Sequence, residues 1–229
     1  MKRRRHVLAA IGLVGRLYGL LLISLAGILA LRAPEPLMRW VNRHNSPAAD
    51  SFFQAVTWLG DGWFTVAVLL VLLCRSYRRA LLVLFSYALS GLLVQLGKHL
   101  LFPGSPRPAQ FFKATLHTFH TVDGVVLHHF GSLPSGHTAT AFALFTILAL
   151  ESRGWGWQGW YLMLACLVGY SRVYLFQHFV LDVAIGSVLG VLSGLAAYGL
   201  LGWWQRRSPA RWLDRGLLVR SAFGPKPAL

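Results

Sequence analysis

Acidic side chains are scarce in this chain. Asp and Glu account for 7 of the 229 residues, against 22 Lys and Arg, and charged residues of both signs reach only 13%. Soluble globular proteins carry about 25% charged residues, so a chain that is 55% hydrophobic is unlike a soluble domain. The basic surplus alone fits nucleic-acid binding, but Lys and Arg lie mainly in the tails and short loops between apolar runs. We therefore expect a membrane, and no nucleic acid, as the partner.

Cysteine is almost absent as well. Cys74 and Cys166 both lie in or beside apolar segments, which argues against a disulfide framework, and no zinc-ligand spacing is present. The chain also lacks an internal repeat, a low-complexity tract and any sign of a second domain. We predict one membrane domain over residues 1–204, followed by a basic cytoplasmic tail over residues 205–229.

Long apolar runs are abundant instead. Crossing a bilayer takes roughly 20 residues. Six segments approach that length: 8–31, 55–74, 80–101, 137–152, 157–174 and 179–203. They predict an all-α, polytopic membrane protein with about six transmembrane helices. Arg16 and Asp61 fall inside the first two runs, so these positions lie at an interface or their side chains snorkel. Alternatively, residues 45–59 form an amphipathic helix on the membrane surface.

The distribution of basic residues predicts the orientation. With the N-terminus inside, the cytoplasmic segments hold fourteen Lys and Arg residues and the outer segments seven, as the positive-inside rule requires. Three of those seven, Lys98, Arg107 and Arg172, belong to polar clusters described below. No typical cleavage pattern follows the charged start Met1–Arg5. We therefore predict an uncleaved anchor and two cytoplasmic termini.

The longest predicted loop, 102–134, then lies outside the membrane and is helical or irregular. Loops of this length are usually functional or disordered. It carries a group of histidines with one aspartate: His117, His120, Asp123, His128 and His129. The first two histidines are spaced for one helical turn, so a zinc site is an alternative to ordinary loop histidines near the headgroups. We predict no metal site here.

His178 and Asp182 form one of three polar clusters at the ends of the apolar runs. Residues four apart share one face of a helix, so the carboxylate of Asp182 can accept a proton from one imidazole nitrogen. The other nitrogen is then a free lone pair, which makes a nucleophile or a base. The alternative is a structural histidine that caps a membrane helix.

A second cluster, Pro134-Ser135-Gly136-His137, begins the fourth apolar run. The proline fits a helix start, and the serine can cap it. Backbone amides at a helix N-terminus bind phosphate oxygens, and His137 would stand beside such an oxygen as a general acid. The same four residues are equally common in a simple turn.

Lys98, Arg107 and Arg172 provide the cations of this outer face. A transferring phosphoryl group spreads negative charge over three equatorial oxygens, and three fixed cations can neutralise it without a metal. Each of them taken singly also fits a snorkelling interfacial residue.

Together these residues resemble the type-2 phosphatidic acid phosphatase and vanadium haloperoxidase superfamily. Its signature is a Lys followed by Arg-Pro, then Pro-Ser-Gly-His, then Ser-Arg with five residues before His and three more before Asp. The second part matches Pro134 to His137 completely, and the third matches Ser171, Arg172, His178 and Asp182. The first part departs from the pattern, because eight residues separate Lys98 from Arg107 instead of the usual six. The signature runs from residue 98 to 182, and Lys98 is its least secure position.

The resemblance implies a two-step reaction without a cofactor. His178 would attack phosphorus and form a phosphohistidine, oriented by Asp182, while His137 protonates the departing lipid oxygen and later activates water. The phosphate oxygens would be held by five residues: Lys98, Arg107, Ser135, Gly136 and Arg172.

We accordingly predict a lipid phosphatase of a bacterial inner membrane with its site facing the periplasm. The substrate classes are undecaprenyl diphosphate, phosphatidylglycerol phosphate, phosphatidate and lipid A, and shared motifs do not choose among them. Lipid-to-lipid phosphotransfer, a membrane transporter and, by family, a vanadate-dependent peroxidase are the alternatives. The oligomeric state is left open.

Overall fold

The computed structural model describes residues 2–218, and this part of the chain is all-helical, with one isolated bridge between Pro106 and Phe130 in place of any sheet. The predicted all-α class is confirmed. The helices, in chain order, are α1 (Lys2–Leu31), α2 (Pro34–Arg43), α3 (Pro47–Thr57), η1 (Trp58–Gly60), α4 (Gly62–Arg75), α5 (Tyr77–Leu96), η2 (Gly97–Leu101), α6 (Pro108–Phe111), η3 (Lys113–Thr118), α7 (Gly136–Glu151), α8 (Trp155–Tyr174), α9 (Val180–Arg207) and η4 (Arg211–Asp214).

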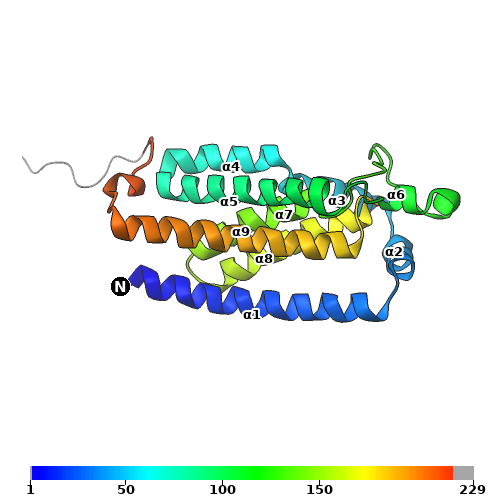
Figure 1. Ribbon diagram of the computed structural model, residues 1–229, viewed down its shortest axis with the longest axis horizontal. Helices are drawn as coiled ribbons and strands as arrows, with labels where there is room; N and C mark the ends of the chain where they lie inside the picture. Colours follow the sequence, from blue (N-terminus) through cyan, green and yellow to red (C-terminus); the bar gives the residue numbers. More distant parts are fainter. Residues whose placement is uncertain (1, 219–229) are drawn as a thin grey trace, which may run out of the picture.

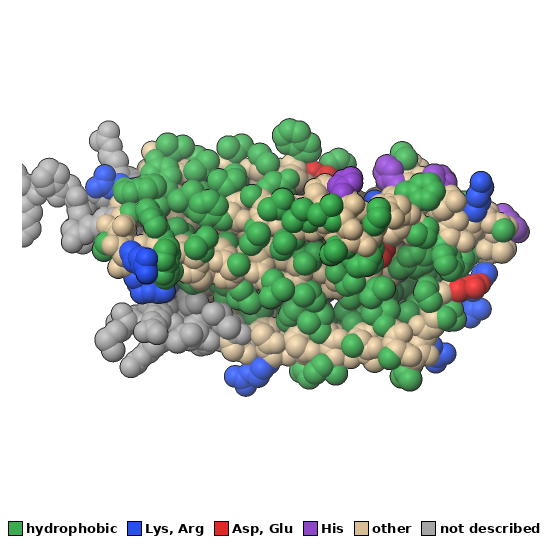
Figure 2. Space-filling model, viewed as in Figure 1, with side chains coloured by type: hydrophobic (Ala, Val, Ile, Leu, Met, Phe, Trp, Pro, Cys, Tyr) green, Lys and Arg blue, Asp and Glu red, His purple; other side chains and the backbone are tan. Residues whose placement is uncertain are grey.

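The long helices form a bundle along one axis. In Figure 1, α1, α4, α5 and α9 run lengthwise, while α2 and α6 lie at one end and the start of α1 and the end of α9 lie at the other. Apolar side chains cover the flank of the bundle, and basic side chains gather near its two ends (Figure 2). This is the surface expected of helices that face lipid.

Several helices are long and apolar enough to cross a membrane. Within the described residues, three segments meet that condition alone: Val14–Leu31, Tyr77–Leu101 and Val180–Arg207. The pair Pro47–Gly60 and Gly62–Arg75, bent by 56°, adds a fourth if it is one span. Helices α7 and α8 occupy the other two predicted runs, and the count of six stays a prediction.

The segment 45–59 is one arm of this bent pair. Helix α3 continues through η1, and the chain then turns at Asp61 into α4. The carboxylate of Asp61 caps α4, because its Oδ1 accepts a hydrogen bond from the Trp63 amide at 2.8 Å. Arg16, in α1, keeps an exposed guanidinium whose Nε donates to the Gly12 carbonyl.

The loop 102–134 combines the short helices α6 and η3 with irregular chain, as predicted. Aromatic residues anchor it: the ring centroid of Phe119 lies 4.8 Å from that of Phe112 and 5.0 Å from that of Phe176, in the link between α8 and α9. The loop therefore packs onto the chain segment that carries His178.

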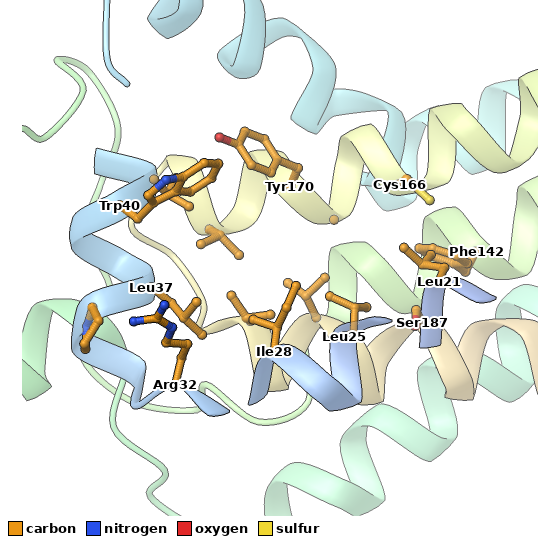
Figure 3. Close-up of a pocket in the computed structure, with 16 residues that line it drawn as sticks. Leu21, Leu25, Ile28, Arg32, Leu37, Trp40, Phe142, Cys166, Tyr170 and Ser187 are labelled. Carbon is orange, nitrogen blue, oxygen red and sulfur yellow. The ribbon is translucent and has the colours of Figure 1, made fainter. Parts of the chain in front are cut away.

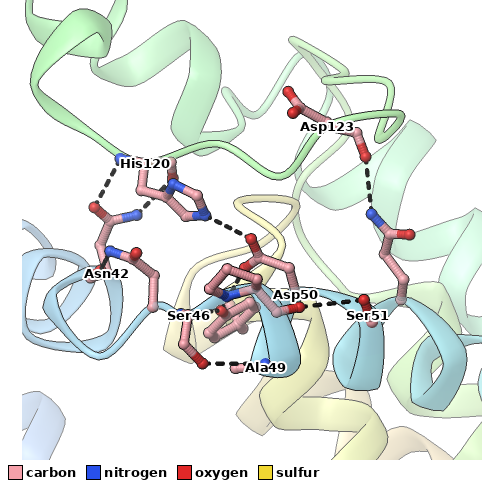
Figure 4. Close-up of polar contacts among 11 residues, drawn as sticks. Asn42, Ser46, Ala49, Asp50, Ser51, His120 and Asp123 are labelled. Carbon is pink, nitrogen blue, oxygen red and sulfur yellow. Dashed lines mark hydrogen bonds and ion pairs between the residues drawn. The ribbon is translucent and has the colours of Figure 1, made fainter.

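A polar contact ties the same loop to α2 and α3 (Figure 4). His120 Nε2 lies 2.9 Å from Asp50 Oδ2, and its amide donates to Asn42 Oδ1 at 2.9 Å. Tyr174, at the end of α8, donates to Asp50 Oδ1 at 2.6 Å. No group of three or more His, Cys, Asp or Glu side chains is placed to hold a metal within residues 2–218. Cys74 is a free thiol, as is Cys166.

Helices α7 and α9 make the most extensive contact of the bundle. Glycines recur at every fourth position of α9, at Gly186, Gly190 and Gly194. A Cβ atom at Gly190 would lie 2.4 Å from the Ala139 carbonyl oxygen, and one at Gly186 would lie 2.6 Å from the Ser135 carbonyl oxygen. Small residues at this spacing let helix backbones approach closely. The glycine face thus sets the distance between the helices that carry the second and third motifs.

A buried ion pair joins α5 to α7 at the end of the bundle away from the loop. Arg78 Nη1 lies 2.6 Å from Glu151 Oε1, and the two side chains are only 5% and 6% exposed. Arg78 Nε also donates to Gln205 of α9 at 3.2 Å. Breaking such a pair leaves a buried charge without a partner, which costs about 3–5 kcal/mol. This cluster fixes three helices relative to one another.

We expect Gly190→Ala to lower the melting temperature, because a methyl group has no room beside the Ala139 carbonyl and overpacking costs about 1–3 kcal/mol. Gly199→Ala is the matched control on the same helix, since a Cβ there meets nothing within 4 Å. That control should be neutral or slightly stabilising. Thermal unfolding in detergent measures both variants, and equal melting temperatures would contradict the close approach of α7 and α9.

Candidate active site

His178 and Asp182 face each other between α8 and α9. His178 Nδ1 lies 3.4 Å from Asp182 Oδ2, and the side chains are 2% and 5% exposed. The same oxygen accepts the Phe179 amide at 2.9 Å and a short hydrogen bond from Ser132 Oγ. With Asp182 ionised, Nδ1 carries the imidazole proton and Nε2 keeps a free lone pair. Ser132 could not be predicted as a site residue from the sequence, because no local pattern distinguishes it.

A tight turn brings Arg172 to the same place. The amides of Gln177 and His178 donate to the Arg172 carbonyl at 3.0 and 3.1 Å. Phe176, inside this turn, has a φ of +60°, a conformation that costs a bulky residue of the order of 1–3 kcal/mol. Its buried ring, packed against Phe119, holds the turn in place. Strain of this kind clusters at functional sites.

Arg172 is a buried cation with an unused donor. Its Nη1 donates to Thr57 Oγ1 at 2.7 Å. Its Nε has no hydrogen-bond partner among the described residues, although it is buried. A buried guanidinium without a full set of partners is costly, and a bound anion would satisfy it. No pattern in the sequence points to Thr57, which is 115 residues from Arg172.

Arg107 is held by neutral oxygen atoms. Its Nε donates to the Phe130 carbonyl at 3.1 Å, and its Nη1 donates to Gln177 Oε1 at 3.0 Å. Gln177, adjacent to His178, is itself fixed by a bond to the Val126 carbonyl. This glutamine was missed from sequence as well. None of these partners neutralises Arg107, so its charge stays available to an anion.

Lys98 lies in a π-helical turn. Helix α5 passes into η2, where the Phe102 amide donates to the Gly97 carbonyl five residues back, at 2.9 Å. The following turn is fixed by Ser105, whose hydroxyl accepts the Leu133 amide at 3.0 Å. The longer spacing from Lys98 to Arg107 is accommodated by this wider turn and loop. Lys98 interacts electrostatically with three other residues of the site: Arg107, Arg172 and Asp182.

The second motif begins α7 as predicted, but its serine does not cap the helix through its side chain. Ser135 is the N-cap residue, and its Oγ pairs with Thr138 Oγ1 at 2.9 Å instead of a backbone amide. The expectation of a serine cap was wrong because this neighbouring hydroxyl competes for the side chain. The Ser135 amide donates to the Asp182 carbonyl at 3.1 Å, which joins the second motif to the third.

His137 lies next to Asp61. Its Nε2 is 3.8 Å from Asp61 Oδ2, and these side chains are 36% and 28% exposed. Electrostatic interactions connect His137 to four further groups: Lys98, Arg107, Arg172 and His178. It also lines a cavity of about 360 Å³ between α4, α5 and α7. A charged residue within an apolar run is itself a signal of function, and Asp61 could have been found by it.

The eight predicted site residues are thus brought together at one end of the bundle. A larger, apolar cavity of about 640 Å³ lies apart from them, among α1, α2, α8 and α9. Figure 3 shows Leu21, Leu25 and Ile28 of α1 facing this space. None of the eight predicted site residues lines it.

The electrostatics of the site disfavour further positive charge. Burial lowers the pKa of His178 to about 4, and the charges of Arg107 and Arg172 act in the same direction, whereas Asp182 opposes them. The pKa of the loop residue His128 is lowered as well, by burial and then by Arg107. His178 is therefore neutral at physiological pH.

Fold and site define an all-helical protein with helices that can span a membrane and with a cationic, histidine-containing polar centre at one end. Residues 79–206 match the PAP2 superfamily. This match covers more than half of the 229 residues, and the chain belongs to this superfamily, which confirms the resemblance seen in the motifs.

Two curated relatives match the chain over shorter stretches. The bacitracin transport permease protein BcrC of Bacillus licheniformis is 38% identical over 82 residues, which are 35% of this chain and 39% of the relative. The lipid A 1-phosphatase of Porphyromonas gingivalis is 41% identical over 73 residues, 29% of this chain and 16% of the relative. The chain thus spans less than half the length of either relative.

Two solved structures share the fold. The crystal structure of Aquifex aeolicus LpxE superimposes with a TM-score of 0.63 at 28% identity, over 72% of this chain and 94% of that one. The crystal structure of the PAP2-type phosphatidylglycerolphosphate phosphatase of Bacillus subtilis also superimposes with a TM-score of 0.63. Its identity is 24%, over 86% of this chain and 98% of that one. The second likeness concerns the fold alone.

The low pKa of His178 predicts a pH-dependent contribution to stability. Below about pH 6.5 the unfolded state binds a proton at this histidine and the folded state does not. The contribution is therefore present above about pH 6.5 and is lost as the pH falls toward 4. Relative to His178→Gln, the wild type should lose on the order of 2 kcal/mol between about pH 7.5 and 4.5.

Thermal unfolding in detergent across this pH range measures the difference. The control is His129→Gln, because His129 is exposed and its replacement should leave the pH dependence unchanged. A difference between wild type and His178→Gln that stays constant with pH would rule out a buried neutral His178.

Proposed function

We propose that this chain is a membrane lipid phosphatase that hydrolyses a lipid phosphate or diphosphate. The observation that carries the proposal is the buried His178–Asp182 pair, at 3.4 Å, in electrostatic contact with the cations Arg107 and Arg172. Membership of the PAP2 superfamily supports it, as does the similarity to the lipid A 1-phosphatase of Porphyromonas gingivalis. The shared family does not choose the substrate, so undecaprenyl diphosphate, phosphatidylglycerol phosphate, phosphatidate and lipid A all stay candidate substrates.

In the first step His178 Nε2 attacks phosphorus in line. A P–N bond forms while the bond to the lipid oxygen breaks, and His137 gives its proton to that oxygen. Asp182 accepts a hydrogen bond from the Nδ1–H of His178 and stabilises the positive charge that develops on the ring. In the second step His137 takes a proton from water, whose oxygen attacks phosphorus, and the P–N bond breaks to release phosphate.

The equatorial oxygens are bound by Lys98, Arg107, Arg172, the Gly136 amide and the Ser135 hydroxyl. The unpartnered Nε of Arg172 supplies one donor. Either hydroxyl can be the donor in the Ser135–Thr138 pair. When Thr138 donates, the Ser135 proton is free for a phosphate oxygen. Preorganised donors of this kind stabilise the charge of the transition state.

We place the site on the periplasmic side of a bacterial inner membrane, with both termini cytoplasmic. The excess of basic residues in the segments next to the termini supports this orientation. The loop 102–134 and the start of α1 lie at opposite ends of the bundle (Figure 1), which is compatible with it.

Release of inorganic phosphate from purified protein tests the reaction and the substrate together. The panel contains one lipid of each candidate class and an acceptor lipid that reports phosphotransfer. We expect phosphate release from at least one lipid, and a loss of at least about 1000-fold in His178→Ala, since nucleophile removal commonly costs more than that. His117→Ala, in the outer loop, is the matched histidine control.

Two results would contradict hydrolysis by this site. The first is transfer to the acceptor lipid without free phosphate. The second is full activity in His178→Ala. Transport of a lipid or peptide without phosphate release would instead favour the permease activity that the name of the Bacillus licheniformis relative describes.

We also expect the reaction to need no metal, because the three cations Lys98, Arg107 and Arg172 can neutralise the charge of the phosphoryl oxygens. Phosphate release should be unchanged in excess EDTA after dialysis against the chelator. Loss of activity that zinc or magnesium restores would overturn this expectation and would direct attention to the outer-loop histidines.

A further inference from the structure

The turn Gly60-Asp61-Gly62 packs directly against the start of α7. A Cβ atom at Gly60 would lie 2.7 Å from the His137 carbonyl oxygen, and one at Gly62 would lie 2.5 Å from Tyr87 Oη. At Gly60, where the neighbour is the backbone of His137, only glycine permits so close an approach. The 56° bend between η1 and α4 therefore fixes Asp61 relative to the backbone of His137.

The two carboxylate oxygens of Asp61 have different neighbours. Oδ1 accepts the Trp63 amide at 2.8 Å and so caps α4. Oδ2 faces His137 Nε2 at 3.8 Å. This distance is longer than a hydrogen bond, but catalytic contacts are often long before substrate binds. The cap leaves Oδ2 available to the imidazole.

Three cations act on His137. Lys98, Arg107 and Arg172 interact with it electrostatically, and each opposes a protonated imidazole. Asp182 is already bonded to His178, Ser132 and Phe179. Within residues 2–218, Asp61 is the carboxylate that contacts His137.

We propose that Asp61 is a positioning residue for His137, which it orients through Nε2 and keeps protonated until the leaving oxygen takes the proton. This inference rests on the proposed function. His137 then gives its Nδ1 proton to the lipid oxygen as the P–O bond breaks, and retains its Nε2 proton toward Asp61. In the second step Nδ1 recovers a proton from the attacking water.

Asp61→Asn tests this role, because Asn caps a helix as well as Asp does but carries no charge. We expect kcat for a lipid monophosphate to fall about 10- to 100-fold, the range of general acid catalysis. The alkaline limb of the kcat profile should move to lower pH by about one unit, because the imidazolium loses its counter-charge.

The leaving group supplies a second readout. A lipid alkoxide needs protonation, whereas the lipid phosphate that leaves a lipid diphosphate is a better leaving group. Asp61→Asn should therefore impair the monophosphate reaction at least about tenfold more than the diphosphate reaction. The matched control is Asp50→Asn, which removes the carboxylate at 2.9 Å from His120 and should change neither readout.

The outcomes separate the two proposals. An unchanged pH profile with equal losses on both substrates would reduce Asp61 to a helix cap and overturn the inference, while the phosphatase proposal stands. A wild type that releases no phosphate from either lipid would overturn the phosphatase proposal and the inference with it. If Asp61→Asn lowers the melting temperature strongly, Asp61→Ser is measured instead, because serine also caps a helix. Its pH profile and its losses on the two substrates then test the inference.

Discussion

The close contact between α7 and α9 holds the second and third motifs next to each other. Gly186 and Gly190 let the α9 backbone approach the Ser135 and Ala139 carbonyls, nearer than any side chain would permit. At the end of this contact the Ser135 amide bonds to the Asp182 carbonyl. A substitution that separates the helices would therefore move the second motif away from the third, even though it touches neither.

The two ends of the bundle each contain a buried arginine, and the two arginines differ in their partners. Arg78 is paired with Glu151 at 2.6 Å and bonded to Gln205, so its charge is neutralised and it serves the packing of three helices. Arg172 is equally buried, yet it bonds only to the Thr57 hydroxyl and keeps Nε unpartnered among the described residues. A buried cation without a charged partner lowers the stability of the fold. Binding of an anion at this end of the bundle would offset that loss of stability.

Sequence patterns predicted the helices and the principal site residues because both depend on short-range spacing. Apolar length defines a span, and four residues separate His178 from Asp182. The residues that were missed act across long separations: Ser132 is 50 residues from Asp182, and Thr57 is 115 residues from Arg172. Such contacts follow from tertiary packing, which no local pattern contains. The π-helical turn at Lys98 is likewise a consequence of packing.

The two histidines of the site differ in a way that matches the two tasks of the proposed mechanism. His178 is 2% exposed and held at 3.4 Å from Asp182, so its ring is fixed and kept neutral for attack. His137 is 36% exposed and lies 3.8 Å from Asp61, so it can both give a proton to the leaving oxygen and recover one from water. A nucleophile needs an immobile lone pair, whereas an acid that must later act as a base needs access to solvent. Burial thus separates the roles of two residues with the same side chain.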